Sequence, residues 1–482
     1  MYKAYENESY AHTPSKKMNL KNNYRRHFVT TFYLLVVFLL SSILSACSKN
    51  NHGLDPKSPI TLTMWHNFGG EMQQQMDYLI DEFNSTIGKE QGIIINVTLI
   101  SSTADLQENF NQILGDEPGA PEMPDITTCY PQTAVLFQEK DMITNLDHYF
   151  NAKELSSYIP EFIDEGRFSD NGLYVFPFAK STEVIYLNHT LFDEFSSDTG
   201  ITMDCFNTFE GLTDAAMRYY DWTDAKTPQI EGDGKAFFSA DSWINLFQAG
   251  MIQLGSSLFS EETINDADPN FLHIWDTIHS VASHGGFAFY DGYSSDLSKT
   301  GDLICSSGSS AGVLFYGDTI TYDDNQVRSV EYNILPFPCF ENGSKAAIQR
   351  GSGLCIKKTN ETREYAASVF LKWFTDSVQN MRFVSSTGYL PVTKEAFTNE
   401  LPKSIEQMTD VKIKKMLETE LDMYHNYKFF TAPVFDSYDS LSKRFESNIK
   451  SILSNQSQES LGEDTKLDPL SALQEFLKIM GE

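Results

Sequence analysis

Apolar and polar residues alternate over 60–65 and again over 93–99, the pattern of a β-strand with two unlike faces. The apolar residues of 72–83 and of 106–114 recur instead at helical spacing, and a further short strand is predicted at 124–129. Strand, helix, strand, helix, strand is the order of an α/β unit with a parallel sheet.

The remaining chain is predicted to contain a second structural region. The tract 172–188 is extended, and Pro177 near its middle suits a crossing between domains better than a central strand. A mostly helical region follows to about residue 300, and 311–318 is predicted to be a strand that ends in a turn. One helix is predicted at 364–383, and the last 90 residues are predicted to be helical.

A long apolar run at 28–44 follows several basic residues and ends in Ser45-Ala46-Cys47, after which the chain turns polar. A charged segment, an apolar segment and small residues before a cleavage point are typical of a secretion signal. The cysteine directly after Leu44-Ser45-Ala46 resembles a bacterial lipobox, in which Cys47 is acylated and becomes the mature N-terminus. The alternative is a retained transmembrane helix, but the run is just short of the roughly 20 residues needed to span.

The start of this leader is an open question. Counted from Met1 the leader has 46 residues, whereas counted from Met18 it has 29. Because signal peptides usually have about 15–30 residues, we hypothesise that Met18 is the true start. N-terminal sequencing of the unprocessed precursor tests this, and a Met1 start would refute it.

Net charge and cysteine content restrict the classes of partner and of metal or disulfide site that the chain can have. The chain carries a formal net charge of −30, and its first 46 residues hold six Lys or Arg and two Asp or Glu, so the remaining 436 residues carry −34. Such an acidic surface argues against nucleic acid as a partner. The length predicts two or three domain-sized units. The five cysteines after Cys47 lack metal-site spacing and are predicted to be buried thiols or at most one or two disulfides.

Several short motifs occur in a fixed order between Ile60 and residue 450. They are Trp65-His66 with Gly69-Gly70-Glu71, Tyr174-Val175-Phe176-Pro177-Phe178, Ile185-Tyr186-Leu187-Asn188 continuing to Phe192, Gly317-Asp318, Arg350-Gly351-Ser352-Gly353, and Thr387-Gly388-Tyr389-Leu390-Pro391-Val392. In this order they resemble the bacterial extracellular solute-binding proteins, family 1, which deliver ligands to ABC importers.

Within that family the chain looks most like the branch that contains the glycerol-3-phosphate binder. The tracts 65–71, 177–182, 242–246 and 387–391 carry this likeness. Three departures stand against that ligand. Ala240 stands where the branch has a Trp, Pro131 stands where it has an acidic residue, and Phe429–Asp436 lacks the arginine that reads the phosphate. A neutral sugar or oligosaccharide therefore fits better, with a glycerol phosphate as the alternative.

The resemblance implies an α/β fold of two periplasmic-binding-protein-like lobes (type II) that close on ligand like a clamp. By that map, 1–46 is the lipoprotein signal peptide, 47–58 a tether, 59–178 with 355–392 lobe one, and 180–350 with 394–482 lobe two. It further implies a monomer without cofactor, tethered to the cell membrane in the periplasm or at the outer face. Its partners would be a small-molecule ligand and ABC permease subunits with a cytoplasmic ATPase.

Sugar binding needs aromatic faces and planar polar groups, which selects the candidate ligand-binding residues. They are Trp65, His66, Tyr130, Ser181, Trp243, Asp318, Gly351, Ser352 and Tyr389. The structural alternatives are core positions for the two Trp, a helix cap for His66 and a plain turn for Asp318. Arg350 is the cation best placed to meet an anion, and the sequence leaves its orientation open.

An enzyme is the alternative from another class, and a surface adhesin is a third. Gly308-Ser309-Ser310-Ala311-Gly312 matches the Gly-x-Ser-x-Gly elbow of serine hydrolases, which needs a strand before it and a helix after it. The pattern here predicts a polar loop before it and an apolar strand at 313–316 after it. No His-Glu-x-x-His, paired-Cys zinc site or phosphate loop occurs in the sequence, so we predict neither catalytic nor metal-binding residues. Scattered carboxylates leave a glycosidase pair open.

Overall fold

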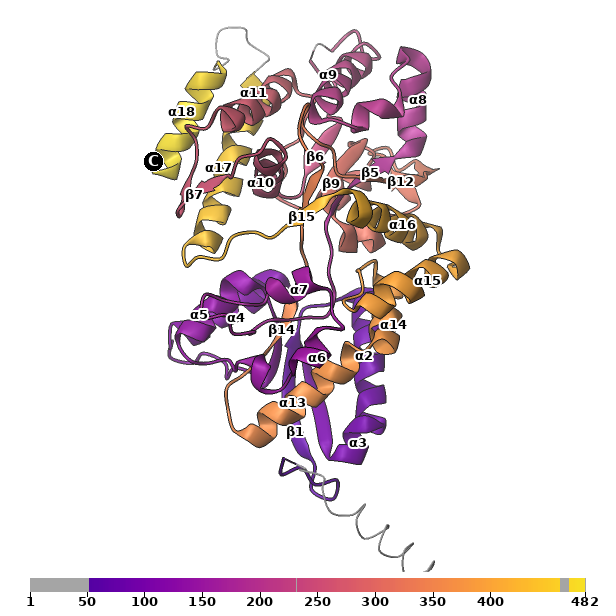
Figure 1. The fold of residues 1–482 in the computed structure, drawn as a ribbon. Helices are drawn as coiled ribbons and strands as arrows, with labels where there is room; N and C mark the ends of the chain where they lie inside the picture. Colours follow the sequence, from indigo (N-terminus) through magenta and orange to yellow (C-terminus); the bar gives the residue numbers. More distant parts are fainter. Residues whose placement is uncertain (1–51, 231, 460–467, 482) are drawn as a thin grey trace, which may run out of the picture. The chain divides into compact units, whose positions relative to one another are not determined.

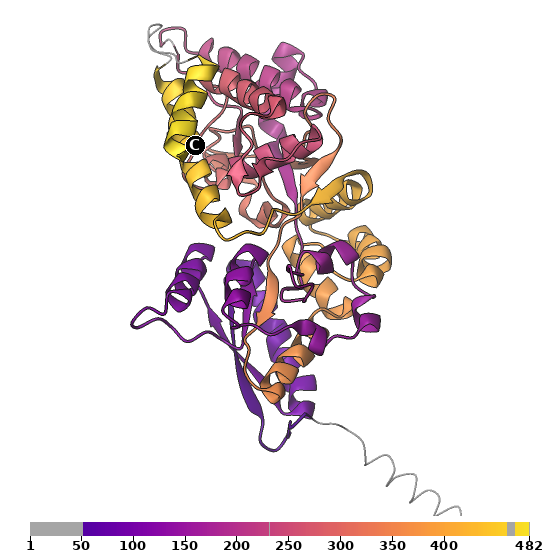
Figure 2. The same cartoon turned by 60° about the vertical axis from the view of Figure 1, so that its left-hand side comes forward.

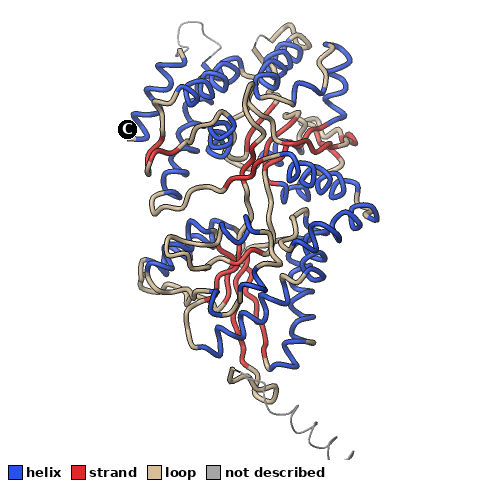
Figure 3. Tube along the Cα trace, viewed as in Figure 1, coloured by secondary structure: helices blue, strands red, loops and turns tan. Residues whose placement is uncertain are grey.

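The computed structural model describes residues 52–230, 232–459 and 468–481, and Cys47 with the proposed leader lies outside this range. From Leu54 onward the chain forms one compact unit. Its two larger β-sheets are each surrounded by helices (Figure 1), and Figure 3 distinguishes strands from helices along the same trace. The α/β fold class is confirmed.

The first sheet has the strand order β2-β1-β3-β14-β4. Strands β1 (Ile60–His66), β2 (Ile93–Leu99) and β3 (Ile126–Cys129) run parallel, as the hydrophobic pattern predicts. Strand β14 (Gly353–Ile356) adds antiparallel to β3, and β4 (Phe176–Pro177) antiparallel to β14. Segments far apart in the sequence therefore complete one mixed sheet.

Helices cover both faces of this sheet, as turning the view by 60° makes clear (Figure 2). On one face, Leu62 and Met64 of β1 belong to the same buried cluster as α2 (Gly70–Ser85), α13 (Glu361–Phe374) and α14 (Ser377–Thr387). On the other face, Trp65 packs in a second cluster with α4 (Thr103–Leu114) and α5 (Pro131–Glu139). Consecutive residues of a strand point to opposite faces, so Met64 and Trp65 end in different cores.

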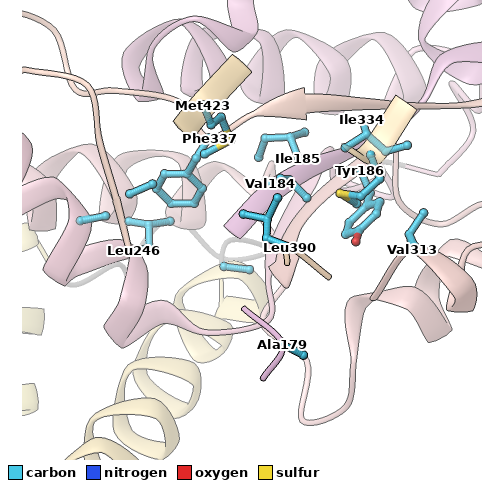
Figure 4. Close-up of a cluster of buried hydrophobic side chains, with 14 of the residues drawn as sticks. Ala179, Val184, Ile185, Tyr186, Leu246, Val313, Ile334, Phe337, Leu390 and Met423 are labelled. Atoms are coloured by element: carbon cyan, nitrogen blue, oxygen red, sulfur yellow. The ribbon is translucent and has the colours of Figure 1, made fainter. Parts of the chain in front are cut away.

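The second sheet has the order β12-β5-β9-β6. Strand β5 (Glu183–Asn188) is buried throughout and pairs antiparallel with both β12 (Tyr332–Pro336) and β9 (Cys305–Ser309). Strand β6 (Phe238–Ala240) runs parallel to β9. Figure 4 shows Val184, Ile185 and Tyr186 of β5 among the apolar side chains of this core.

The helices packed around the second sheet are α8 (His189–Thr199), α9 (Phe209–Asp224), α10 (Trp243–Gln253), α11 (Pro269–His284), α16 (Val411–Asn426) and α17 (Tyr438–Glu459). The other helices are α3 (Ile87–Gln91), α6 (Ala152–Leu155), α7 (Pro160–Asp164), α12 (Ser294–Ser298), α15 (Leu401–Gln407) and α18 (Pro469–Met480), with the short turns η1 (Leu146–His148), η2 (Met203–Phe206), η3 (Ser310–Phe315) and η4 (Ala396–Glu400). Small sheets pair β7 (Phe259–Ser260) with β8 (Thr263–Ile264), β10 (Thr319–Thr321) with β11 (Val327–Ser329), and β13 (Ala346–Ile348) with β15 (Lys428–Phe430).

Between the two sheets the chain crosses at 178–182, and two other segments lie beside this crossing. The backbone of Lys180 bridges to Leu390, and that of Ser181 exchanges two hydrogen bonds with Arg350. The hydroxyl of Thr182 donates to the carbonyl of Ile348 at 2.9 Å. Backbone pairing therefore holds these three segments in one register next to the candidate site.

The structure corrects two predictions and decides between the alternatives of a third. The tract 311–318 is not a strand: β9 ends at Ser309, and the 3₁₀ helix η3 follows directly. The apolar stretch 364–383 forms two helices, α13 and α14, because Asp376 caps the start of the second. All five cysteines in the described range are free thiols and four of them are buried, so the structure agrees with buried thiols and not with disulfides.

Within residues 52–230, 232–459 and 468–481, every helix is too short or too polar to cross a membrane.

Candidate functional site

A cavity of about 670 Å³ lies between elements of both sheets. Its wall combines α4, the start of α5, Asn245 of α10, Tyr293, the segment 348–351 and the first turns of α17. Most of these groups are amides, hydroxyls, tyrosines and charged side chains. A cavity of this size and polarity suits a small hydrophilic ligand.

Arg350 and a buried carboxylate form the polar base of this cavity. The guanidinium of Arg350 donates to Oε1 of Glu183 at 3.1 Å, and the amide of Asn245 donates to the same oxygen at 2.7 Å. Glu183 is 1% exposed, whereas the Arg350 side chain keeps 31% of its surface exposed. Arg350 can therefore offer further N–H groups to a ligand while its charge is balanced from behind.

A second charged pair supports the backbone next to Arg350. The ammonium of Lys180, 2% exposed, donates to Glu165 and to the carbonyl of Gly351. The amide of Gln349 donates to the same Glu165 carboxylate at 2.6 Å. These bonds fix the segment 349–351, from which three consecutive residues reach the cavity.

Tyrosines supply the aromatic surface of the cavity. Tyr130 follows the last residue of β3 and is 42% exposed, and Tyr293 at the start of α12 is 69% exposed. Tyr438 is nearly buried, and its hydroxyl accepts from Gln248 at 3.0 Å. Two exposed aromatic faces in a polar cavity are suited to the C–H-rich faces of a sugar ring.

The rim of the cavity joins α5 to α17. The hydroxyl of Thr133 lies 3.0 Å from Oε1 of Gln107 and 3.5 Å from a carboxylate oxygen of Asp439. Gln132 donates to the backbone carbonyls of 432 and 433. Burial raises the pKa of the Asp439 carboxyl, and the charge of Lys443 one turn later acts against this rise. The contact across this rim is thus polar and weak.

The structure brings four of the nine predicted residues to or beside the cavity. Tyr130 and Gly351 line it, and Ser352 lines a small hollow that shares Thr103 and Tyr130 with it. Ser181 lies beneath it, where its backbone pairs with Arg350 and its hydroxyl accepts from Ser309 at 3.3 Å. Arg350, whose orientation the sequence leaves open, faces the cavity.

The other five lie elsewhere. Trp65 is in the core beneath α4 and α5, and Trp243 is fully buried against Phe289 at a centroid distance of 4.6 Å. His66 is buried, and its Nδ1 accepts from the backbone N–H of Phe68, so it acts within a turn.

Asp318 is an exposed turn residue 3.1 Å from the ammonium of Lys412. Tyr389 packs parallel to Phe383 at 6.1 Å, outside the cavity wall. For Trp65, Trp243 and Asp318 the structural alternative therefore describes the position better, whereas His66 bonds within a turn and does not cap α2, whose start has no side-chain cap.

Several wall residues were not predicted from sequence, namely Gln107, Glu165, Asn245, Tyr293, Tyr438, Asp439 and Lys443. They belong to helices and loops without a sequence motif of their own. Only Asn245 had a signal, since it lies in the tract 242–246 that carries the branch likeness.

The structure around the Gly-x-Ser-x-Gly motif at 308–312 differs from the predicted one. A strand, β9, does precede Ser310 and a 3₁₀ helix follows it, contrary to the predicted loop and strand. Ser310 is fully buried, however, and its hydroxyl accepts from the backbone N–H of Thr182 at 3.3 Å. A nucleophile must be reachable by substrate, so Ser310 serves the packing of the crossing segment. No group of three or more potential metal ligands gathers in the described parts of the chain.

The chain is similar to known proteins in sequence pattern and in fold. A family model described as "Bacterial extracellular solute-binding protein" matches residues 79–412. No curated protein matches the chain.

Similar solved structures share the fold at low identity. The UgpB protein of Mycobacterium tuberculosis in complex with glycerophosphocholine is 16% identical, with a TM-score of 0.67 over 88% of this chain and 97% of that one. The substrate-binding protein Lmo0181 of Listeria monocytogenes in complex with cycloalternan is 16% identical, with a TM-score of 0.66 over 88% and 98%. The cyclic α-maltosyl-1,6-maltose binding protein of Arthrobacter globiformis is 17% identical, with a TM-score of 0.64 over 88% and 99%.

The two-lobed binding-protein fold is thereby established, and the family consists of binding proteins rather than enzymes. Because the family model covers more than half of the sequence, the chain belongs to the bacterial extracellular solute-binding proteins.

Proposed function

We propose that this protein is the lipid-anchored substrate-binding component of an ABC importer and that it captures a neutral sugar or oligosaccharide in the 670 Å³ cavity. The observation that carries the proposal is the cavity wall. Tyr130 and Tyr293 offer exposed aromatic faces, and hydrogen-bonding side chains such as Asn245 and Gln107 surround them. This combination recognises ring faces and hydroxyl groups together.

The domain map fits this role. Lobe one at 59–178 with 355–392 and lobe two at 180–350 with 394–482 each contribute wall residues, so a ligand would touch both at once. Contacts made to both lobes favour the closed state, which the permeases would recognise. The hinge would run through the paired crossing at 178–182, 349–351 and 389–391.

A thermal-shift screen tests the ligand. The panel contains maltose, maltotriose, cyclic oligosaccharides, glycerol 3-phosphate and glycerophosphocholine. A specific ligand at a hundredfold its Kd stabilises a protein by about 2.7 kcal/mol, which gives a clear rise in melting temperature. We expect a rise with at least one neutral sugar and no conversion of that sugar to product. Turnover would refute a pure binder, and a rise with the phosphate compounds alone would overturn the ligand class.

A glycerol phosphate is the second candidate, because two cations, Arg350 and Lys443, line the cavity. The charge of Arg350 is already matched by Glu183, so the neutral ligand is favoured.

The lipid anchor has its own test. Cys47→Ser should release the protein from the membrane fraction into the soluble fraction after cell disruption, while Cys205→Ser, which alters a thiol of the folded body, should leave it attached. Equal membrane attachment of the Cys47→Ser protein would refute acylation at this position.

A further inference from the structure

The buried carboxylate of Glu183 lies behind Arg350 at the base of the cavity, where it can affect which ligand binds without contacting that ligand. Glu183 is buried in the first position of β5, and Arg350 comes from a segment 167 positions later in the chain. Among the described residues Glu183 is the only carboxylate within ion-pair distance of the Arg350 guanidinium, at 3.1 Å, and the charge of Asp241 acts on it from further away. An Arg side chain stays charged at every physiological pH, so its effect on a ligand depends on this partner.

The rest of the wall shows the same matching of charge. Lys180 is bonded to Glu165, and Lys443 lies one helical turn from Asp439, whose charged form it favours. With Glu108 on the wall, four carboxylates accompany three cations among the described residues of the cavity and their direct partners. An anionic ligand would therefore enter a site with no surplus positive charge.

We propose that Glu183 is a specificity-determining residue that neutralises Arg350 and thereby makes the cavity accept hydroxyl groups while rejecting phosphate groups. This rests on the proposed function and adds to it that the sugar carries no phosphate. Arg350 then donates hydrogen bonds as a charge-balanced group. Without the charge of Glu183 the same guanidinium would lose its bonded counter-charge and keep only the more distant Asp241, which brings it closer to the arrangement that binds phosphate.

The test replaces the carboxylate by its isosteric amide. Glu183→Gln keeps an oxygen that can accept from both Arg350 and Asn245, but it removes the negative charge. Calorimetric titration with glycerol 3-phosphate and with inorganic phosphate should show binding to the variant that is at least about tenfold tighter than to the wild type. Glycerol, the uncharged analogue, should show no such gain. The double variant Glu183→Gln/Arg350→Gln should lose it again.

Asp125→Asn is the matched control. It breaks an Arg–carboxylate pair, Arg363 with Asp125, in which the Arg side chain has the same 31% exposure, but which joins α13 to the start of the central strand β3 and does not line the cavity. This variant should bind phosphate compounds no better than the wild type.

A folded Glu183→Gln protein, shown by its circular dichroism, that gains no affinity for either anion overturns the inference. If that variant fails to fold, the wild-type protein is tested for thermal stabilisation by glycerol 3-phosphate and by glycerol. Greater stabilisation by glycerol 3-phosphate overturns the inference, and no greater stabilisation supports it. Failure of every sugar to bind would refute the proposed function, yet the anion gain of Glu183→Gln would still be measurable.

Discussion

Gly351 gives the sharpest stability prediction, since it stands where the crossing segments meet the cavity. Its φ is +99°, a backbone conformation that side chains disfavour. A Cβ at this position would lie 2.4 Å from the carbonyl oxygen of Ala179 and 3.0 Å from Cα of Lys180, both backbone atoms of the crossing. Gly351→Ala therefore adds a clash to the conformational strain.

The magnitude follows from the two contributions. The positive φ costs about 1–2 kcal/mol, and displacing a packed backbone costs a further 1–3 kcal/mol or so. Gly119→Ala measures the cost of the positive φ alone, because the φ of Gly119 is +91° but a Cβ added there would meet nothing within 4 Å. Gly351→Ala should thus lower the free energy of unfolding by about 2–5 kcal/mol, and Gly119→Ala by only about 1–2 kcal/mol.

Urea unfolding measures both variants, followed by tryptophan fluorescence and by circular dichroism in parallel. Coinciding transitions justify a two-state free energy for the comparison. If Gly351→Ala loses no more stability than Gly119→Ala, the tight backbone contact at the crossing is refuted.

Three further predictions concern single side chains. Tyr130→Ala should weaken sugar binding at least about tenfold in titration calorimetry, with little change in stability. The control Tyr290→Ala changes an exposed tyrosine outside the cavity wall and should leave the affinity unchanged. Equal affinities of the two variants would show that Tyr130 is not part of the site. Burial lowers the pKa of His66 from 6.5 to about 4, so the free energy of unfolding should fall by up to about 3 kcal/mol as the pH drops from 6.5 to 4. This loss should vanish in His66→Gln and persist in the control His148→Gln, which changes an exposed histidine. Urea midpoints measured against pH test this. Burial raises the pKa of the Glu420 carboxyl well above its usual range. The neutral carboxyl therefore stabilises the fold below its ordinary pKa, and this stabilisation is lost as the pH rises. Glu420→Gln should raise the melting temperature at neutral pH, and a lower melting temperature would contradict this.

The sequence predicted the first sheet well because its strands carry a strong local pattern. Residues 60–65, 93–99 and 124–129 alternate or run apolar, and amphipathic spacing follows the first two of them, so strand and helix could be told apart. The tract 311–318 failed because its apolar residues suit a strand and a 3₁₀ turn equally. The burial of Ser310 depends on contacts with Thr182, far away in sequence.

The site was harder to predict, for physical reasons. Trp65 was expected at the cavity because it ends a strand, but the sheet is covered on both faces and position 65 points into the core under α4. Trp243 opens a helix among aromatic residues and fills the core as well. Arg350 and Glu183 could not be paired in advance, since nothing local in the sequence links residues 167 positions apart.

We propose that a neutral sugar binds between Tyr130, Arg350 and Tyr293. Hydrogen exchange read by mass spectrometry tests it most directly, with and without whichever panel sugar gives the largest thermal shift. We expect slower exchange in three segments far apart in the sequence, 130–133, 348–351 and 438–443, all of which contribute residues to the cavity wall. Protection confined to the surface hollow at Asp193, Trp222 and Lys226, or no protection from any sugar of the panel, would contradict it.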